Sequence, residues 1–599
     1  MTDGEKTKLS KIFLESWHPF FWIAMLIFLV YSATLFSKIV YLDDNVFVTG
    51  QYQFNRHLSN IPQTFNEDIF RTPYNGGTFY RPILRLTFML DAQFGERGVV
   101  FMSHFTNILL HILAICLLFK FLLAIDIKKE TAFLFALIFG IHPLTAQTAA
   151  FIPGRNDSLL AVFIFLSLIF FINFLQTQKN KHLLWHLSFF ALALFTKETA
   201  IALPAICAIY FLIFIKNFEL RNTSRPMSAK AAATPKRSEA ECGRCERGVF
   251  PAPAFAPLAS VATAFSLSAR FVIQSKKYKI YLKLGLSWIG IGIFWFLIRR
   301  SVLHNFIGNA SYNFLLSIFK NLPSLIPAIG KIFLPFNLSV FPVMNDMTIA
   351  YGSISLILLA IWFCFCKKKN LKLIAFGFLW FFIFILLTLV KPVNTVPEFS
   401  ENRIYLPMFG FIFVILGLGV IRLPAVIEKK INYEISQKKI ILLASILIIL
   451  IFSSITFYRN NYYKDKINFW KNAAETSPSF AFNYNNLGAM YYLDGKYDLA
   501  EECYKKSLAI NNFEPMVHNN LGLIYTNKGL FKDAEQEYLE ELSFNPYYDN
   551  AHFNLGILYY KIGKLEEAKK EWKKTLEINP EHGGARHLID VLNGGKMGL

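Results

Sequence analysis

Long apolar runs, separated by short polar segments, occupy the first 457 residues of the chain. A helix that crosses the hydrocarbon core of a membrane needs about 20 apolar residues. The runs that approach this length are 19–37, 102–123, 131–150, 158–176, 183–196, 199–216, 279–299, 316–337, 349–366, 372–390, 404–421 and 439–457. The pattern therefore predicts an all-α, polytopic membrane domain over residues 1–457.

The run at 316–337 differs from the others because it includes Lys320, Asn321 and Lys331 together with Pro323 and Pro327. Charged side chains are costly within lipid, so we interpret this segment as an interfacial or re-entrant helix. About eleven spans then remain. With that number, every basic cluster between spans lies on the side of the N-terminus, as the bias toward basic cytoplasmic loops requires.

The N-terminal run sets the orientation of the chain. Basic residues precede the run at 19–37, which is longer than a signal-peptide core and lacks a small-residue cleavage site after it. We expect an uncleaved signal anchor with a cytoplasmic N-terminus, so that residues after 457 lie outside the cytoplasm. The abundance of Phe, Ile, Lys and Asn is typical of an AT-rich bacterial genome, which predicts a bacterial inner membrane and a periplasmic C-terminal domain.

A second pattern, with a period of 34 residues, begins after the last span. The recurring positions are Asn486-Leu487-Gly488, Asn520-Leu521-Gly522 and Asn554-Leu555-Gly556, followed by Ala500, Ala534 and Ala568. This period, with small residues where paired helices cross, is typical of tetratricopeptide repeats, which stack into an α-solenoid with a concave surface for partner proteins. We expect three units over 481–582 (481–514, 515–548 and 549–582), a connector at 458–480 and a tail or cap at 583–599.

Composition narrows the function classes. The net charge is +20, but the basic residues form short clusters between apolar runs, which argues against nucleic-acid binding. The seven cysteines give no disulfide framework, and the isolated pair Cys242 and Cys245 lacks the second ligand pair that a structural zinc site needs. Residues 226–270 contain no Ile, Asn or Tyr and are rich in Ala, Pro and Ser, which predicts a disordered cytoplasmic loop.

Candidate chemistry gathers in the loop after the first span. Asp43 and Asp44 are adjacent carboxylates at the expected membrane surface, where one of them suits a general base for an acceptor hydroxyl. The alternative is a helix cap and a solvated turn. Tyr80 and Arg81 follow in the same loop, and a guanidinium matches phosphate oxygens, although anchoring at lipid headgroups is the alternative.

Acid–cation pairs recur at the outer ends of later spans. These pairs are Arg155 with Asp157, Lys197 with Glu198, and Glu401 with Arg403. A single pair of this kind is usually an ion pair at the membrane edge. His104 and His142 lie in or near spans, where packing between helices is favoured over metal ligation.

Taken in order, these motifs resemble the bacterial relatives of the transmembrane and tetratricopeptide-repeat-containing family, whose animal members are O-mannosyltransferases with the class C glycosyltransferase fold. The residues that carry the resemblance are Asp43-Asp44, Tyr80-Arg81-Pro82, Ser103-His104-Phe105-Thr106-Asn107, His111, His142-Pro143, Gly154-Arg155-Asn156-Asp157, Thr196-Lys197-Glu198-Thr199 and Tyr405-Leu406-Pro407.

The resemblance implies roles for these residues. Asp43 would be the catalytic acid/base, with Asp44 beside it. The donor phosphate would be lined by Arg81, Arg155 and Lys197, and also by Arg403, although the acidic-Arg group before Tyr405 is spaced differently in the family. The supporting residues would be Tyr80, Asp157, Glu198, Glu401, His104 and His142.

We therefore predict a membrane glycosyltransferase that moves a sugar, mannose by resemblance, from a polyprenyl-phosphate carrier to Ser or Thr hydroxyls of an extracytoplasmic protein. The repeats would bind the acceptor or another partner polypeptide. Asp43 and Asp44 could bind a divalent metal, but the resemblance implies that neither a cofactor nor a metal is required. One alternative is a catalytically silent membrane scaffold that uses its repeats for protein–protein interaction. A transporter is the second alternative, but the polar residues lie at span ends, whereas transporters place theirs near the midplane.

Overall fold

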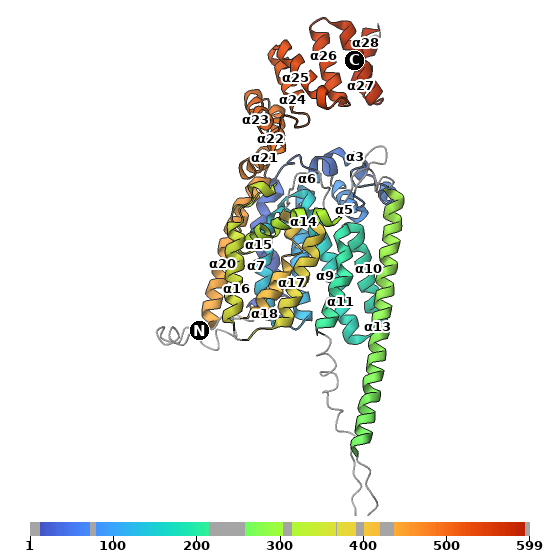
Figure 1. The fold of residues 1–599 in the computed structure, drawn as a ribbon, viewed down its shortest axis with the longest axis vertical. Helices are drawn as coiled ribbons and strands as arrows, with labels where there is room; N and C mark the ends of the chain where they lie inside the picture. Colours follow the sequence, from blue (N-terminus) through green and yellow to red (C-terminus); the bar gives the residue numbers. More distant parts are fainter. Residues whose placement is uncertain are drawn as a thin grey trace, which may run out of the picture.

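Helices make up the computed structural model, which describes residues 12–71, 79–214, 258–303, 314–366, 368–390, 401–419 and 437–593. No strand element occurs within these ranges. Figure 1 shows a bundle of long helices, from one end of which a tail of shorter helices extends. The predicted all-α class, a helical membrane domain followed by a tetratricopeptide-repeat solenoid, is confirmed.

The long helices of the bundle coincide with the predicted spans. They are α2 (His18–Tyr31, extended by η1, Ser32–Phe36), α6 (Val99–Ala124), α7 (Lys129–Gly140), α9 (Arg155–Thr177), α10 (Asn180–Thr196), α11 (Leu203–Phe214), α13 (Leu258–Val302), α16 (Ala350–Phe365), α17 (Leu371–Thr388), α18 (Phe409–Leu418) and α20 (Gln437–Asn460). Shorter elements connect them: η2 (Asn45–Gly50), α3 (Tyr52–Asn55), α4 (Ile61–Thr64), α5 (Pro82–Ala92), η5 (Pro143–Thr145), α8 (Ala146–Ala150), η7 (Glu198–Ala202), α14 (Phe314–Asn321), α15 (Leu325–Phe333) and η11 (Glu401–Ile404).

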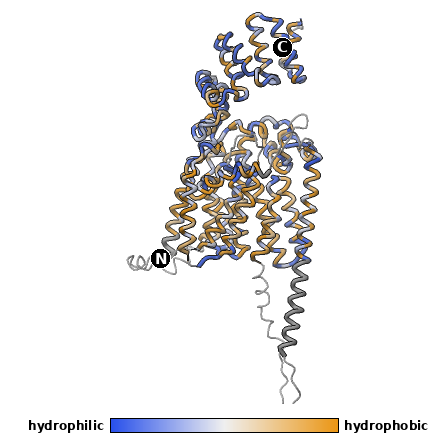
Figure 2. The backbone as a smooth tube through the Cα atoms, viewed as in Figure 1, coloured by the Kyte–Doolittle hydropathy of each residue, from blue (hydrophilic) through white to orange (hydrophobic). Residues whose placement is uncertain are grey.

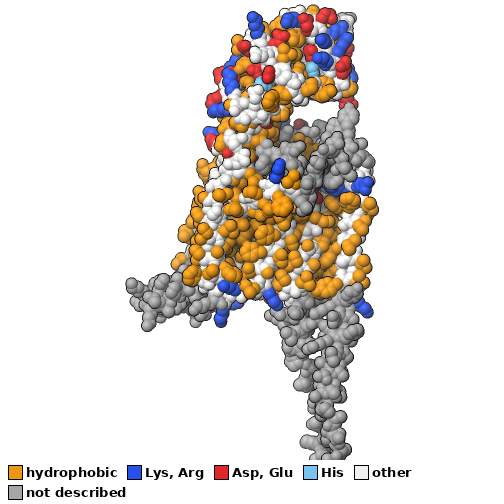
Figure 3. Space-filling model, viewed as in Figure 1, with side chains coloured by type: hydrophobic (Ala, Val, Ile, Leu, Met, Phe, Trp, Pro, Cys, Tyr) orange, Lys and Arg blue, Asp and Glu red, His pale blue; other side chains and the backbone are white. Residues whose placement is uncertain are grey.

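The surface of the bundle is that of a membrane protein. Six helical stretches among the described residues are long and apolar enough to cross a membrane, or seven if one bent pair is a single span, and three apolar helices are shorter. Apolar residues concentrate in the bundle (Figure 2), where they form a belt with lysines and arginines near its edges (Figure 3). The number of about eleven spans stays a prediction.

The predicted span at 131–150 is broken. Helices α7 and α8 are bent by 53° at the break that follows Gly140. Pro143 cannot donate a backbone hydrogen bond, so the helix ends before it. His142 caps the next turn, since its Nδ1 accepts from the backbone N–H of Leu144 at 3.2 Å. The sequence prediction of a continuous helix missed this break.

The segment predicted to be interfacial or re-entrant forms two short helices. Pro323 lies in the 3-10 turn η9 (Leu322–Ser324), which separates the 8 residues of α14 from the 9 residues of α15. At about 1.5 Å per residue, neither helix reaches the roughly 30 Å of a hydrocarbon core. A lysine that faces lipid would destabilise the helix, but Lys331 is buried in α15 and paired with Glu401.

Helix α13 begins earlier than expected. The sequence predicted a disordered loop over residues 226–270, but α13 begins within that range, at Leu258. Its first turns are rich in alanine, which has the highest helix propensity. The rest of that loop, including Cys242 and Cys245, lies outside the described residues.

The tail consists of paired helices. They are α21 (Lys466–Thr476), α22 (Ala481–Leu493), α23 (Tyr497–Ile510), α24 (Val517–Lys528), α25 (Phe531–Phe544), α26 (Asp549–Lys561), α27 (Leu565–Ile578) and α28 (Gly583–Leu592). A Cβ atom on Gly522 would lie 2.6 Å from the ring of Tyr538, and one on Gly556 would lie 2.4 Å from that of Trp572. The small residues of the 34-residue period therefore do allow close helix crossing.

Two of the repeats place a histidine ring between a glutamate carboxylate and a backbone carbonyl. His518 Nδ1 lies 2.7 Å from Glu537 Oε2, and its Nε2 lies 3.1 Å from the carbonyl oxygen of Asn512. Carboxylate and carbonyl oxygens accept hydrogen bonds, so these partners favour the imidazolium form of His518, in which both nitrogens donate. Residues 34 positions later repeat these contacts, because His552 meets Glu571 at 2.6 Å and the carbonyl of Pro546 at 3.1 Å.

His518 makes the stability of the repeats depend on pH. Burial lowers the pKa of His518, but the hydrogen bonds with Glu537 and Asn512, together with the charges of Glu537 and Glu540, raise this pKa above its ordinary value. The stabilisation is therefore complete below about pH 6.5 and is lost as the pH rises through the raised pKa. We expect His518→Gln to lower the thermal midpoint of the intact chain in detergent at pH 5.5 but not at pH 8.5. The loss should not exceed about 1 kcal/mol, because Glu537 is partly exposed. An equal loss at both pH values would contradict this account.

Candidate functional site

The loop after the first span lies at the same end of the bundle as the repeats. The backbone N–H of Lys38 donates to the carbonyl of Lys464 at 2.8 Å, just before α21. The indole Nε1 of Trp470, within α21, donates to the carbonyl of Val40 at 3.0 Å. The loop that carries Asp43 is thus fixed against the helix that leads into the repeats.

Asp44 organises this loop. Its carboxylate accepts backbone N–H bonds from Val40 at 2.7 Å, Leu42 at 3.0 Å and Asn45 at 2.9 Å. The side chain is only 1% exposed, and burial raises the pKa of its carboxyl to about 7, against the lowering effect of those hydrogen bonds. Asp44 therefore caps η2 and shapes the turn that presents its neighbour.

Asp43 is exposed and lies in the left-handed backbone region, with φ of 64°. Its charge acts on Arg81, whose pKa is lowered by burial but is raised overall by Glu198, Asp157 and Asp43. Arg81 binds Glu198 with two hydrogen bonds, from Nε at 3.2 Å and from Nη2 at 2.8 Å. Arg81 and Glu198 therefore form one ion pair, although they come from separate parts of the chain.

A second ion pair adjoins the first. Lys197 Nζ donates to Asp157 Oδ1 at 2.6 Å and to Asn156 Oδ1 at 3.1 Å. Burial lowers the pKa of Lys197, and the neighbouring Asp157 opposes this effect. The other oxygen of Asp157 accepts from Asn402 Nδ2 at 2.8 Å.

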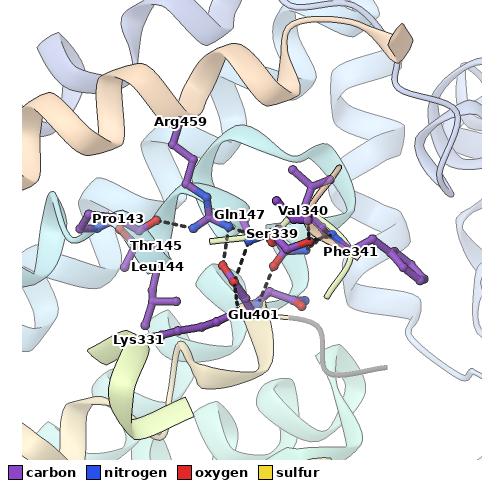
Figure 4. Close-up of polar contacts among 12 residues, drawn as sticks. Pro143, Leu144, Thr145, Gln147, Lys331, Ser339, Val340, Phe341, Glu401 and Arg459 are labelled. Atoms are coloured by element: carbon purple, nitrogen blue, oxygen red, sulfur yellow. Dashed lines mark hydrogen bonds and ion pairs between the residues drawn. The ribbon is translucent and has the colours of Figure 1, made fainter. Parts of the chain in front are cut away.

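Glu401 forms the centre of a fully buried cluster (Figure 4). Its Oε1 accepts from Lys331 Nζ at 2.5 Å and from the backbone N–H of Ser339 at 3.0 Å, while its Oε2 accepts from Arg459 Nη2 at 2.5 Å. Arg459 Nη1 donates in turn to the carbonyl of Pro143 at 2.6 Å. One carboxylate thus ties α15, the end of α20 and the break after α7 together.

Asn402 and Gln147 connect the two polar groups. The backbone N–H of Asn402 donates to Gln147 Oε1 at 2.9 Å, and Gln147 Nε2 donates to the carbonyl of Val340 at 3.0 Å. Since Asn402 also binds Asp157 and follows Glu401 in sequence, polar contacts run from the Lys197 pair to the Glu401 cluster.

Arg155 lies apart from Arg81. Its guanidinium is fully buried and pairs with Asp91 at 2.6 Å. It also donates to Asn107 Oδ1 at 2.7 Å and to the carbonyl of Ser103 at 2.7 Å. In this conformation Arg155 joins α5, α6 and α9, so a direct contact with a donor phosphate stays a prediction.

The remaining predicted residues support the helices around the site. Tyr80 is 1% exposed and donates to the carbonyl of Phe65 at 2.9 Å. His142 Nε2 lies 2.9 Å from the carbonyl of Ile332, and His104 is buried within α6. Arg403 is half-buried in η11, next to Asn402. The roles of these four residues at the site stay predictions.

Sequence reasoning missed Arg459, Asn402 and Asp91. Arg459 follows an apolar run, where an arginine ordinarily reaches toward lipid headgroups. Its partner Glu401 lies 58 positions away, and no local pattern links the two. The polar content of 316–337 indicated that Lys331 does not face lipid, but it did not predict the ion pair with Glu401.

The part of the chain that the structure describes contains no group of three or more His, Cys, Asp and Glu residues arranged to hold a metal ion. The prediction that no cofactor is required remains a prediction.

Two segments of the chain match known families. Residues 82–231 match the family described as dolichyl-phosphate-mannose-protein mannosyltransferase. Residues 481–513 and 549–582 match the tetratricopeptide repeat. The first match begins directly after Arg81 and includes Arg155, Asp157, Lys197 and Glu198.

Several known proteins are similar to parts of the chain. The Protein O-mannosyl-transferase TMTC1 of Homo sapiens is 27% identical over 188 residues, which are 28% of this chain and 21% of that protein. The Protein O-mannosyl-transferase TMTC3 of Mus musculus is 26% identical over 203 residues, which are 32% of this chain and 21% of that protein. The chain thus spans about a fifth of the length of each relative. The first tetratricopeptide-repeat domain of human RPAP3 is 28% identical, covers 20% of this chain and 94% of that domain, and has a TM-score of 0.19.

These findings confirm the predicted resemblance. The chain combines a segment that matches a mannosyltransferase family with segments that match tetratricopeptide repeats, in a helical protein with several candidate membrane spans, and it is glycosyltransferase-like.

Proposed function

We propose that this protein transfers mannose from a polyprenyl-phosphate carrier to Ser or Thr hydroxyls of polypeptides on the side of the membrane where the repeats lie. We further propose a bacterial inner membrane, with the N-terminus in the cytoplasm and the repeats in the periplasm. The domain boundaries follow the sequence prediction, with the transferase in residues 1–457 and the three repeats in 481–582.

One observation carries the proposal. The match to the mannosyltransferase family begins at residue 82, immediately after Arg81, and Arg81 is paired with Glu198 inside the matched segment. A cation that can bind phosphate is therefore held against the matched segment, and the loop of the exposed Asp43 lies at the end of the bundle that also carries the repeats. Asp43 is the proposed acid/base, and Asp44 shapes its loop.

The proposed reaction is a single displacement. Asp43 takes the proton of an acceptor hydroxyl, and the hydroxyl oxygen attacks the anomeric carbon of mannose. The bond between that carbon and the phosphate oxygen breaks, and polyprenyl phosphate leaves with the electron pair. Because one carboxylate acts in one step, the configuration at the anomeric carbon is inverted, unlike in two-step retaining transfer.

Arg81 and Lys197 are proposed to hold the donor phosphate. Arg81 engages Glu198 through Nε and Nη2, so that Nη1 is placed to approach a phosphate oxygen. Positive groups fixed in position stabilise the charge that develops on the leaving phosphate. Arg155, Arg403, Asp157, Glu198, Glu401, Tyr80, His104 and His142 are proposed to support this arrangement.

The donor class can be tested directly. Membranes that contain the chain should transfer labelled mannose from polyprenyl-phosphate mannose to protein, in a form released by β-elimination from Ser or Thr. Membranes without the chain provide the background. The proposal would be overturned if label entered protein only from a nucleotide sugar, or if no label entered protein from any donor.

Arg81→Lys is expected to raise the KM for the donor about 10-fold or more, because a lysine cannot hold Glu198 and a phosphate with the same fork of N–H groups. Arg56→Lys is the matched control, since Arg56 is exposed and lies in the same loop. The measurement is the donor-concentration dependence of transfer in membranes of equal protein content. An equal KM in both variants and the wild type would exclude Arg81 from donor binding.

A catalytically silent scaffold is the second candidate. It is favoured by the pairing of both candidate cations, since Arg81 binds Glu198 and Lys197 binds Asp157. A scaffold would bind its partners equally well after replacement of Asp43 and Asp44, whereas a transferase would lose transfer.

A further inference from the structure

A crevice of about 740 Å3 lies between the first repeat and the membrane domain. One wall is formed by the segment after α2, including Lys38 and Tyr41, and by Val100 of α6. The other wall is formed by Asn468 of α21 and by Lys496, which lies in the turn between α22 and α23. The crevice is thus bounded by three parts of the chain that are far apart in sequence.

Direct contacts hold these walls in place. Lys466 pairs with Asp494 at 2.7 Å, which joins α21 to the turn of the first repeat, and its Nζ also lies 5.6 Å from the centre of the Tyr41 ring. The bonds of Lys38 to Lys464 and of Val40 to Trp470 fasten the opposite wall. The crevice is therefore a formed feature of the junction and does not require the repeats to move.

The crevice lies close along the chain to the proposed catalytic residue. Tyr41 lines it, and Asp43 follows two residues later. Two residues of chain span at most about 7 Å. A polypeptide that lies along Tyr41 would therefore pass close to the backbone of Asp43.

Charge indicates the chemistry of the occupant. Among the acidic lining residues, Asp494 is neutralised by Lys466, and Asp465 accepts from the backbone N–H and Nδ2 of Asn468 at 2.9 Å and 2.8 Å. Lys38 and Lys496 are exposed on opposite sides. Their positive charge is complementary to acidic side chains, and the volume is within the roughly 300–1,000 Å3 of typical ligand sites.

We propose that this crevice binds an extended segment of the acceptor polypeptide, with acidic residues flanking the Ser or Thr that reaches Asp43. This inference rests on the proposed function and specifies its second substrate. The repeats would hold the remainder of the acceptor, while the crevice would set which hydroxyl is presented.

The test measures peptide binding without the sugar donor. The probe is a fluorescein-labelled decapeptide of Glu, Thr and Ala, and its anisotropy is followed with the full chain in phosphatidylcholine nanodiscs. Lys38→Glu/Lys496→Glu is expected to raise the Kd at least about 10-fold, as two lost ionic contacts would. The matched control is Lys532→Glu/Lys573→Glu, which makes the same charge change at exposed positions of the outer repeats and should leave the Kd unchanged.

A second variant and a second ligand complete the test. Asn468→Trp should obstruct the crevice without a change of charge and should also weaken binding, provided that its melting curve matches that of the wild type. An unchanged Kd in a folded double-lysine variant would overturn the proposal. The proposal would also be overturned if the double-lysine variant lost affinity for phosphatidylglycerol vesicles but kept its affinity for the peptide. That result would show that the two lysines bind lipid.

Failure of the crevice and failure of the transferase give different results. Lost peptide affinity in a chain that transfers no mannose would support the crevice and refute the activity. Normal transfer, with an unchanged KM for the peptide in the double-lysine variant, would refute the crevice and leave the activity in place.

Discussion

Asp43→Asn is expected to lower the rate of mannose transfer about 10²- to 10⁴-fold, which is the contribution of a positioned general base. Asparagine has the same shape and tolerates the left-handed backbone that Asp43 adopts, so the loop should keep its structure. The amide cannot accept the hydroxyl proton at neutral pH. The measurement is the initial rate at saturating donor and acceptor, with donor affinity recorded separately.

The control for this variant is Asp533→Asn, which makes the same change at an exposed position in α25. Its transfer rate should equal that of the wild type. Full activity of Asp43→Asn in a folded protein would remove Asp43 from the mechanism.

Glu401→Gln is expected to destabilise the membrane domain by about 3–5 kcal/mol, as removal of one partner does in a buried ionic group. The carboxylate is fully buried and is the partner of both Lys331 and Arg459. A neutral amide would leave two buried cations with much less compensation. The measurement is the thermal midpoint of the intact chain in detergent.

Glu475→Gln is the matched control, because the Glu475 side chain is 63% exposed and its loss should be within about 0.5 kcal/mol. The double variant Glu401→Gln/Lys331→Met also removes one of the two buried cations. It should therefore be more stable than Glu401→Gln, because the effects of neighbouring substitutions are coupled. A loss below about 1 kcal/mol for Glu401→Gln would show that the cluster does not hold these helices together.

The fold could be predicted from the sequence wherever the signal was periodic. Apolar runs of span length and a 34-residue repeat are local patterns, and the helices follow both. The polar residues and prolines of 316–337 predicted an interfacial or re-entrant helix, and the structure divides this segment into two short helices at Pro323. By contrast, the break at Pro143 was hidden because the apolar residues continue on both sides of it.

The candidate site could be predicted only in part, because its partners are distant in sequence. Arg81 and Glu198 are 117 positions apart, and His111 and Tyr405 are 294 apart. A sequence shows that a buried charge needs compensation, but the packing of helices decides which residue provides it. Asp43 and Asp44 illustrate this limit, since neighbouring identical residues have different surroundings and different proposed roles.

The most direct measurement of the central claim is the anomeric configuration of mannose on the acceptor hydroxyl, determined by NMR and compared with that of the polyprenyl-phosphate donor. Single displacement with Asp43 as the base predicts an inverted configuration in every product. A retained configuration would contradict the account, because it would require a covalent intermediate on a second carboxylate.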